Sequence, residues 1–180
     1  CPQPWVSPPS GASLAAAPAS LFVSPALQSG IAVDDLLTVT LELKDVYNLY
    51  GVDVQLEFNP DVLEVADANP FEEGVQITRG TFPDPTQGTV TAEEADNIEG
   101  MVRYALSLSG ASPANGGGTL CSISFRAKAH GYSPLRFHSV QLVEATTGLP
   151  MPVETAGGSV YVGPTHVLYL PLVLKSGAQR

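Results

Sequence analysis

Residues 48–65 read NLYGVDVQLEFNPDVLEV, and this stretch decides the fold class. Positions 53, 55 and 57 are polar, and their neighbours at 52, 54, 56 and 58 are apolar. A period of two is typical of a strand with one face buried and the other in water. Asn59-Pro60-Asp61 then breaks the pattern with residues that favour turns, and an apolar segment resumes at Val62. The stretch therefore predicts two strands joined by a tight turn.

The same alternation recurs on both sides of this stretch. It is found at residues 37–43, 102–108, 123–127, 135–137 and 160–162. Residues that break strands lie between these segments: Phe82-Pro83-Asp84-Pro85, Ser109-Gly110, Asn115-Gly116-Gly117-Gly118 and Gly157-Gly158. No segment carries a helical period over the length of a helix, so we predict an all-β, antiparallel sandwich. A change of parity between Leu120 and Ile123 predicts a bulge near Cys121.

Composition and charge narrow the size and the possible partners. The chain has 180 residues, of which 17 are Gly and 16 are Pro, and 44% are hydrophobic, which predicts one domain rich in turns. The formal net charge is −10. Phosphate backbones and anionic lipid surfaces would repel such a chain, so nucleic acid is excluded as a partner.

The first 19 residues differ from the rest of the chain. They carry no charge and five prolines, and we expect a stalk at 1–19, a sandwich at 20–163 and a separate segment at 164–180. The sequence begins at Cys1 rather than Met, as a mature secreted product does, so we expect an extracellular, cell-surface protein. Cys1 could carry a lipid, pair with Cys121 in a disulfide, or do neither. A lipid on Cys1 is the only expected contact with a membrane.

Residues 166–175 read HVLYLPLVLK and form the most apolar segment of the chain. Positions 167–174 carry no charge and are apolar on both parities, so a strand here needs cover on both faces, or on one face and one edge. Burying three of its Leu side chains is worth about 5 to 8 kcal/mol before entropy. The segment could dock on its own domain, serve as a sorting segment, or add to a neighbouring copy. We predict the last, with an interface of Val167, Leu168, Tyr169, Leu170, Leu172, Val173 and Leu174.

The order of motifs resembles that of cohesin domains over about residues 20–163. The resemblance begins at residues 48–65, with an alternating strand, an Asx-Pro turn and a Val-Leu-x-Val strand. It continues through Arg79-Gly80, Gly88-Thr89-Val90, Gly118-Thr119-Leu120 and Gly158-Ser159-Val160-Tyr161-Val162. The resemblance implies a jelly-roll sandwich of about nine strands, without catalytic activity, that binds calcium-loaded dockerin modules. The segment after residue 163 would then be an extra C-terminal strand.

The resemblance also implies which face would meet a dockerin. In cohesin domains this face is formed by outward residues of the strand that here contains residues 53–57, and of its neighbours. The candidate residues are Asp53, Gln55, Glu57, Thr89, Thr91 and Glu93. Their polar parity predicts exposure on physical grounds alone, and a plain solvated sheet face would show the same pattern.

Residues that could carry catalysis or bind a metal are sparse. His130, His138 and His166 lie far apart, without metal-ligand spacing or a nucleophile motif, so we predict no enzyme and no cofactor. The acidic residues Glu93 and Glu94, with Asp96 close by, lack the glycine-centred loop of a calcium-binding EF-hand. We expect them to be loop charges in water.

Three functions follow, in order of preference. The first is a non-catalytic, adhesive module whose copies build a surface fibre, each donating its apolar terminal strand to the next. The alternative is a cell-surface cohesin that binds a dockerin on polysaccharide-degrading enzymes. A carbohydrate-binding module is the third, and it would need a row of exposed aromatic residues.

Overall fold

The computed structural model describes residues 18–110 and 112–164, and it consists almost entirely of strands. The predicted stalk, Cys1 and the segment 167–174 therefore lie outside the described residues, apart from the stalk's last two positions. Within the described ranges no helix is long and apolar enough to cross a membrane. The elements in chain order are β1 (Ala19–Ser24), β2 (Leu27–Ile31), β3 (Leu36–Glu57), β4 (Leu63–Val65), β5 (Val75–Gln76), β6 (Thr78–Arg79), the 3₁₀ turn η1 (Pro85–Gln87), β7 (Gly88–Asp96), β8 (Met101–Leu108), β9 (Ala114–Ala127), β10 (Gly131–Glu144), β11 (Val153–Ala156) and β12 (Gly158–Val162).

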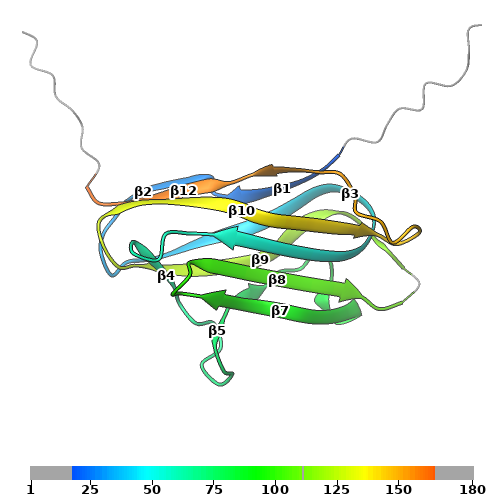
Figure 1. The fold of residues 1–180 in the computed structure, drawn as a ribbon, viewed down its shortest axis with the longest axis horizontal. Helices are drawn as coiled ribbons and strands as arrows, with labels where there is room; N and C mark the ends of the chain where they lie inside the picture. The colour runs from blue at the N-terminus through cyan, green and yellow to red at the C-terminus, as the bar shows by residue number, and fades with distance from the viewer. Residues whose placement is uncertain (1–17, 111, 165–180) are drawn as a thin grey trace, which may run out of the picture.

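The strands form two layers that share β3. In the front layer the strand order is β2-β12-β10-β3-β8-β7-β5, and Figure 1 shows these strands side by side toward the viewer. Behind them, β1 and β9 flank the first half of β3, and β11, β4 and β6 extend this second layer. The pairings are antiparallel except for β1 with β11 and β12 with β2. The all-β sandwich is confirmed.

One long strand, β3, replaces two of the predicted strands. Residues 37–43 and 52–58 were expected as separate strands, but β3 runs from Leu36 to Glu57 and crosses from the back layer to the front. Two register shifts against β9 between Leu43 and Leu49 allow the crossing. Asp45 and Asn48 have φ angles of 56° and 60° there, a left-handed conformation that Asp and Asn tolerate better than most residues. The backbone bends without ending the strand.

The number and limits of the strands also differ from the prediction. There are twelve strand segments among the described residues rather than about nine, because the loops between β4 and β7 contain two-residue strands. The glycine run 115–118 was expected to separate strands, yet it lies within β9. Gly117 permits this, because a Cβ there would lie 2.4 Å from the carbonyl oxygen of Leu43. The bulge near Cys121 is confirmed, since the register skips Leu120.

The core lies between the two layers and is mainly apolar, and Ser133 and Gln76 are its buried polar residues in the described part of the chain. Inward residues of β3 follow the period of two from Leu37 to Leu43 and from Val52 to Leu56, and Val46 and Leu49 continue the buried row through the crossing. Phe58 and Phe125 pack edge to face with their ring centroids 5.1 Å apart, joining the two layers. No element of residues 18–110 and 112–164 packs on the opposite, outward side of the front layer.

Candidate functional site

The outward face of β10, β3, β8 and β7 is the candidate site. No other described element lies in front of it in Figure 1. Inward residues of these strands are buried or half-buried and the polar outward ones are exposed or half-buried, because the register keeps the side chains of neighbouring strands on a common face. The polar outward residues are Arg136, Ser139 and Gln141 on β10, Asp53, Gln55 and Glu57 on β3, Arg103 and Ser107 on β8, and Thr89, Glu94 and Asp96 on β7.

Two hydrogen-bonded side-chain pairs cross the strands on this face. Arg103 donates to Asp53 with an Nη2–Oδ2 distance of 2.8 Å, and this hydrogen bond raises the pKa of the guanidinium. His138 Nδ1 lies 2.6 Å from Glu57 Oε1. His138 sits at a register shift in β10, where it is the extra residue between Phe137 and Ser139. Both pairs are exposed to water, so their chief effect is to orient the side chains that a partner would meet.

A bulge in β7 corrects the predicted set of face residues. The register between β7 and β8 skips Thr91, so the residues after it change sides. Glu94 then lies opposite Arg103 on the candidate face. Glu93 instead lies opposite the buried Tyr104, on the other side of the sheet, where it pairs with Arg79. Asp53, Gln55, Glu57 and Thr89 are outward as predicted, Thr91 is exposed at the bulge, and Glu93 was placed on the wrong face.

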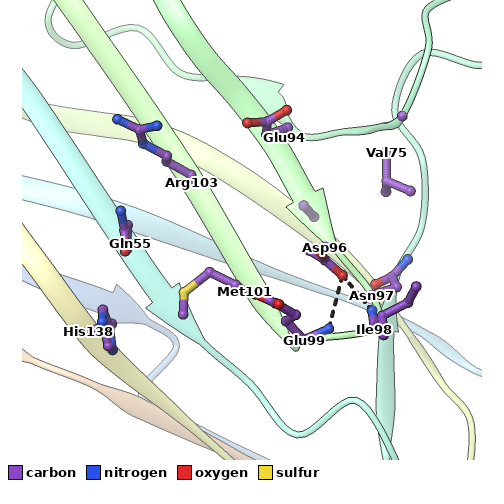
Figure 2. Close-up of a pocket in the computed structure, with 12 residues that line it drawn as sticks. Gln55, Val75, Glu94, Asp96, Asn97, Ile98, Glu99, Met101, Arg103 and His138 are labelled. Atoms are coloured by element: carbon purple, nitrogen blue, oxygen red, sulfur yellow. Dashed lines mark hydrogen bonds between the residues drawn. The ribbon is translucent and has the colours of Figure 1, made fainter.

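A hollow of about 820 Å³ lies at one end of the face. In Figure 2 its labelled side chains come from β10, β3, β8, β7, β5 and the β7–β8 turn. Val75, Ile98 and Met101 provide apolar surface, and Ile98 is almost fully exposed. Charge around it comes from Arg103 and from three carboxylates, Glu94, Asp96 and Glu99, and His138 adds a polar ring. Apolar side chains next to charged groups are typical of a surface that binds a protein side chain, rather than of a reaction centre.

The chemistry of this face gives no ground for a metal site or a catalytic group. Within the described ranges no three His, Cys, Asp or Glu side chains are placed to hold a metal ion. The Asp96 carboxylate accepts hydrogen bonds from the backbone N–H groups of Glu99 and Ile98, which lowers its pKa and commits it to the turn. His138 and His130 belong to different regions, and His166 is outside the described residues.

Cys121 lies away from the face, in the core. It is a fully buried free thiol whose pKa is raised by burial, which favours the unreactive protonated form. The proposed partner of Cys121 in a disulfide, Cys1, is outside the described residues. The thiol therefore serves as a small apolar side chain in β9.

Comparison with known protein families decides what this sandwich is. The sequence profile of the cohesin domain matches residues 22–162, which is most of the chain. The chain belongs to the cohesin family. No curated protein sequence matches this cohesin domain, but its structure resembles many solved cohesins.

Three solved structures illustrate how close that likeness is. A type II cohesin domain from the cellulosome of Acetivibrio cellulolyticus has a TM-score of 0.66 and 14% identity, over 80% of this chain and 95% of that one. A non-cellulosomal cohesin from the archaeon Archaeoglobus fulgidus gives 0.60 and 14%, over 82% and 92%. A type I cohesin–dockerin complex from Clostridium thermocellum gives 0.60 and 14%, over 81% and 99%. At this identity the likeness establishes the fold.

Sequence reasoning missed several residues of the face. Arg103 had a usable signal, because it is the only charged residue at an outward position of the alternating segment 102–108. His138, Val75 and Ile98 had none. They reach the face through a bulge, a two-residue strand and a turn, none of which leaves a period in the sequence.

Proposed function

We propose that this cohesin domain binds a calcium-loaded dockerin module through the outward face of β10, β3, β8 and β7. The observation that carries the proposal is a four-stranded face with two hydrogen-bonded side-chain pairs and a hollow at one end, which no described element covers. Membership of the cohesin family supports it. Two of the similar structures are described as cohesin–dockerin complexes, which supports the choice of partner.

The chain would act as a non-catalytic attachment module outside the cell. Its net charge of −10 and its three carboxylates around the hollow favour a partner with basic residues at the contact. An extracellular location agrees with a partner that needs bound calcium, because calcium is abundant there. The enzyme activity, in this proposal, belongs to the protein that carries the dockerin.

The test is calorimetric titration of the chain with dockerin modules of the organism that makes it. We expect binding with calcium and none after chelation. Ser107→Tyr places a large side chain on the outward face, between Gly51 and Thr89 of the neighbouring strands, and should weaken binding at least about tenfold. The control is Thr38→Tyr, an equally exposed position on the back layer, which should leave the affinity unchanged.

Two outcomes would contradict the proposal. One is that no dockerin of that organism binds, or that its genome encodes none. The other is that Ser107→Tyr and Thr38→Tyr weaken binding equally, since the contact would then lie elsewhere on the domain.

Assembly into a fibre remains a second hypothesis, carried by the sequence of residues 167–174 alone. That segment lies outside the described residues, and it is apolar on both parities. Deletion of residues 164–180 should abolish any polymers of the purified chain while the sandwich stays folded. Polymers that survive the deletion would refute the donor-strand hypothesis.

A further inference from the structure

An apolar patch lies on the outward face of β2, β12 and the first part of β10. Tyr132 and Tyr161 are directly opposite each other on adjacent strands, with 56% and 38% of their surfaces exposed. Next to them, Pro134 lies opposite Ser159, which in turn lies opposite Leu27. Leu27 is 66% exposed. We call Leu27, Tyr132, Pro134 and Tyr161 the tyrosine patch.

The fold does not need these side chains for its core. The alternate residues of the same strands, Ser133, Leu135, Val160 and Val162, point inward and are buried. Single exposed apolar residues are common on protein surfaces, but here they occupy three neighbouring strands. A contiguous apolar surface of this kind indicates that something covers it.

The described chain ends beside this patch. The Gly163 backbone N–H donates to the carbonyl oxygen of Ile31 at 2.8 Å, which holds the end of β12 against β2. A Cβ at Gly163 would lie 3.5 Å from the Tyr161 ring. Pro164 is the last described residue of this range, and the apolar segment 167–174 begins three residues later. Gly163 and Pro164 are residues that favour a reversal of the chain.

We propose that residues 167–174 of the same chain fold back across β12 and cover the tyrosine patch. An extended chain advances about 3.3 Å per residue, so eight residues are long enough to pass over the five residues of β12. A tether of two or three residues holds the segment near the patch at an effective concentration in the millimolar range. A neighbouring copy would have to compete with that concentration.

The inference is independent of dockerin binding, since the tyrosine patch and the candidate site use different parts of the front layer. Both surfaces include part of β10: Tyr132 in its first half belongs to the tyrosine patch, and the second half, from His138, belongs to the candidate site. A segment on the tyrosine patch would leave the dockerin face open. It would also remove the apolar surface that fibre formation needs.

Hydrogen–deuterium exchange of the full chain tests the proposal. We expect the amides of residues 166–175 to exchange at least about tenfold more slowly than in the denatured chain. Tyr132→Ser combined with Tyr161→Ser should return them to the denatured rate. The control is Tyr47→Ser, which removes an exposed tyrosine (73%) on β3, outside the tyrosine patch, and should leave the exchange rates of residues 166–175 unchanged.

A reciprocal measurement covers the case in which the double variant fails to fold. Leu170→Ser with Leu172→Ser changes only the segment, and it should increase hydroxyl-radical oxidation of Tyr132 and Tyr161. Three results would overturn the proposal. The first is fast amide exchange of residues 166–175 in the wild-type chain. The second is slow exchange that persists when both tyrosines are replaced. The third is exchange that slows further as the protein concentration rises, which would indicate that a second copy covers the segment.

Discussion

Asn48 makes four hydrogen bonds that stabilise β3 where it crosses between the two layers. Its side-chain amide donates to Glu144 and Thr146, each at 2.7 Å, and its backbone N–H donates to Asn115 Oδ1 at 2.8 Å. Its carbonyl oxygen accepts from the N–H of Ala145. These bonds join β3 to β9 and to the loop after β10, at a residue whose φ is 60°.

Substitutions at Asn48 separate its hydrogen bonds from its backbone conformation. Asn48→Ala loses both side-chain donors and places an alanine at positive φ, so we expect the free energy of unfolding to fall by roughly 2 to 4 kcal/mol. Asn48→Gly loses the donors but tolerates the conformation, and should cost about 1 kcal/mol less than the alanine variant. Urea unfolding measures both. Equal losses would mean that the conformation at residue 48 carries no strain.

The carboxyl group of Glu144 should make the stability of this region depend on pH. Hydrogen bonds from Thr147 and then Asn48 lower the pKa of its carboxyl group. A carboxylate with a lowered folded pKa stabilises the fold above its unfolded pKa, and the effect is lost as the pH falls through the folded value. We expect Glu144→Gln to be less stable than the wild type at pH 7, and the difference to shrink as the pH falls below the ordinary pKa of a carboxyl group. A difference independent of pH would show that the charge is not involved.

At the scale of elements, the alternation of polar and apolar residues located most strands, but it did not show that two of the predicted strands are continuous in β3. The inward residues of β3, β8 and β12 follow the period of two, because burial of one face selects it. The crossing within β3 and the bulges in β7 and β10 change the parity by one residue. The bulge in β9 left a change of parity between Leu120 and Ile123 in the sequence, but hydrogen bonds to the neighbouring strands decide at which residue each bulge lies.

The bulge at Thr91 predicts that two adjacent glutamates have different roles. Glu94→Lys reverses a charge on the candidate face and should weaken dockerin binding about tenfold or more. Glu93→Ala removes the partner of Arg79 on the other side of the sheet, so it should lower stability by about 1 kcal/mol and leave the affinity unchanged. Titration and urea unfolding of both variants check this. The reverse assignment would mean that β7 runs without its bulge.

For the whole molecule, the sequence predicted the family and the polar rows of the candidate face, while the shape of that face came only from the structure. Asp53, Gln55 and Glu57 could be recognised because they share one strand and one parity. The hollow joins Val75 and Ile98 to β8 and β10, which are distant in sequence. The apolar segment 167–174 could be recognised as needing cover, but the tyrosine patch that offers cover is assembled from three separate strands.

The passage of β3 through both layers should make the sandwich unfold as one unit. Its first half pairs with β1 and β9, and its second half with β8 and β10, so neither layer can lose β3 without the other. Labelling of Cys121 in a Cys1→Ser variant reports opening around β9, and amide exchange of residues 101–108 reports opening of β8. We expect both to share one urea midpoint, and Asn48→Ala to shift the two equally. Separate midpoints would show that the crossing transmits no stability between the layers.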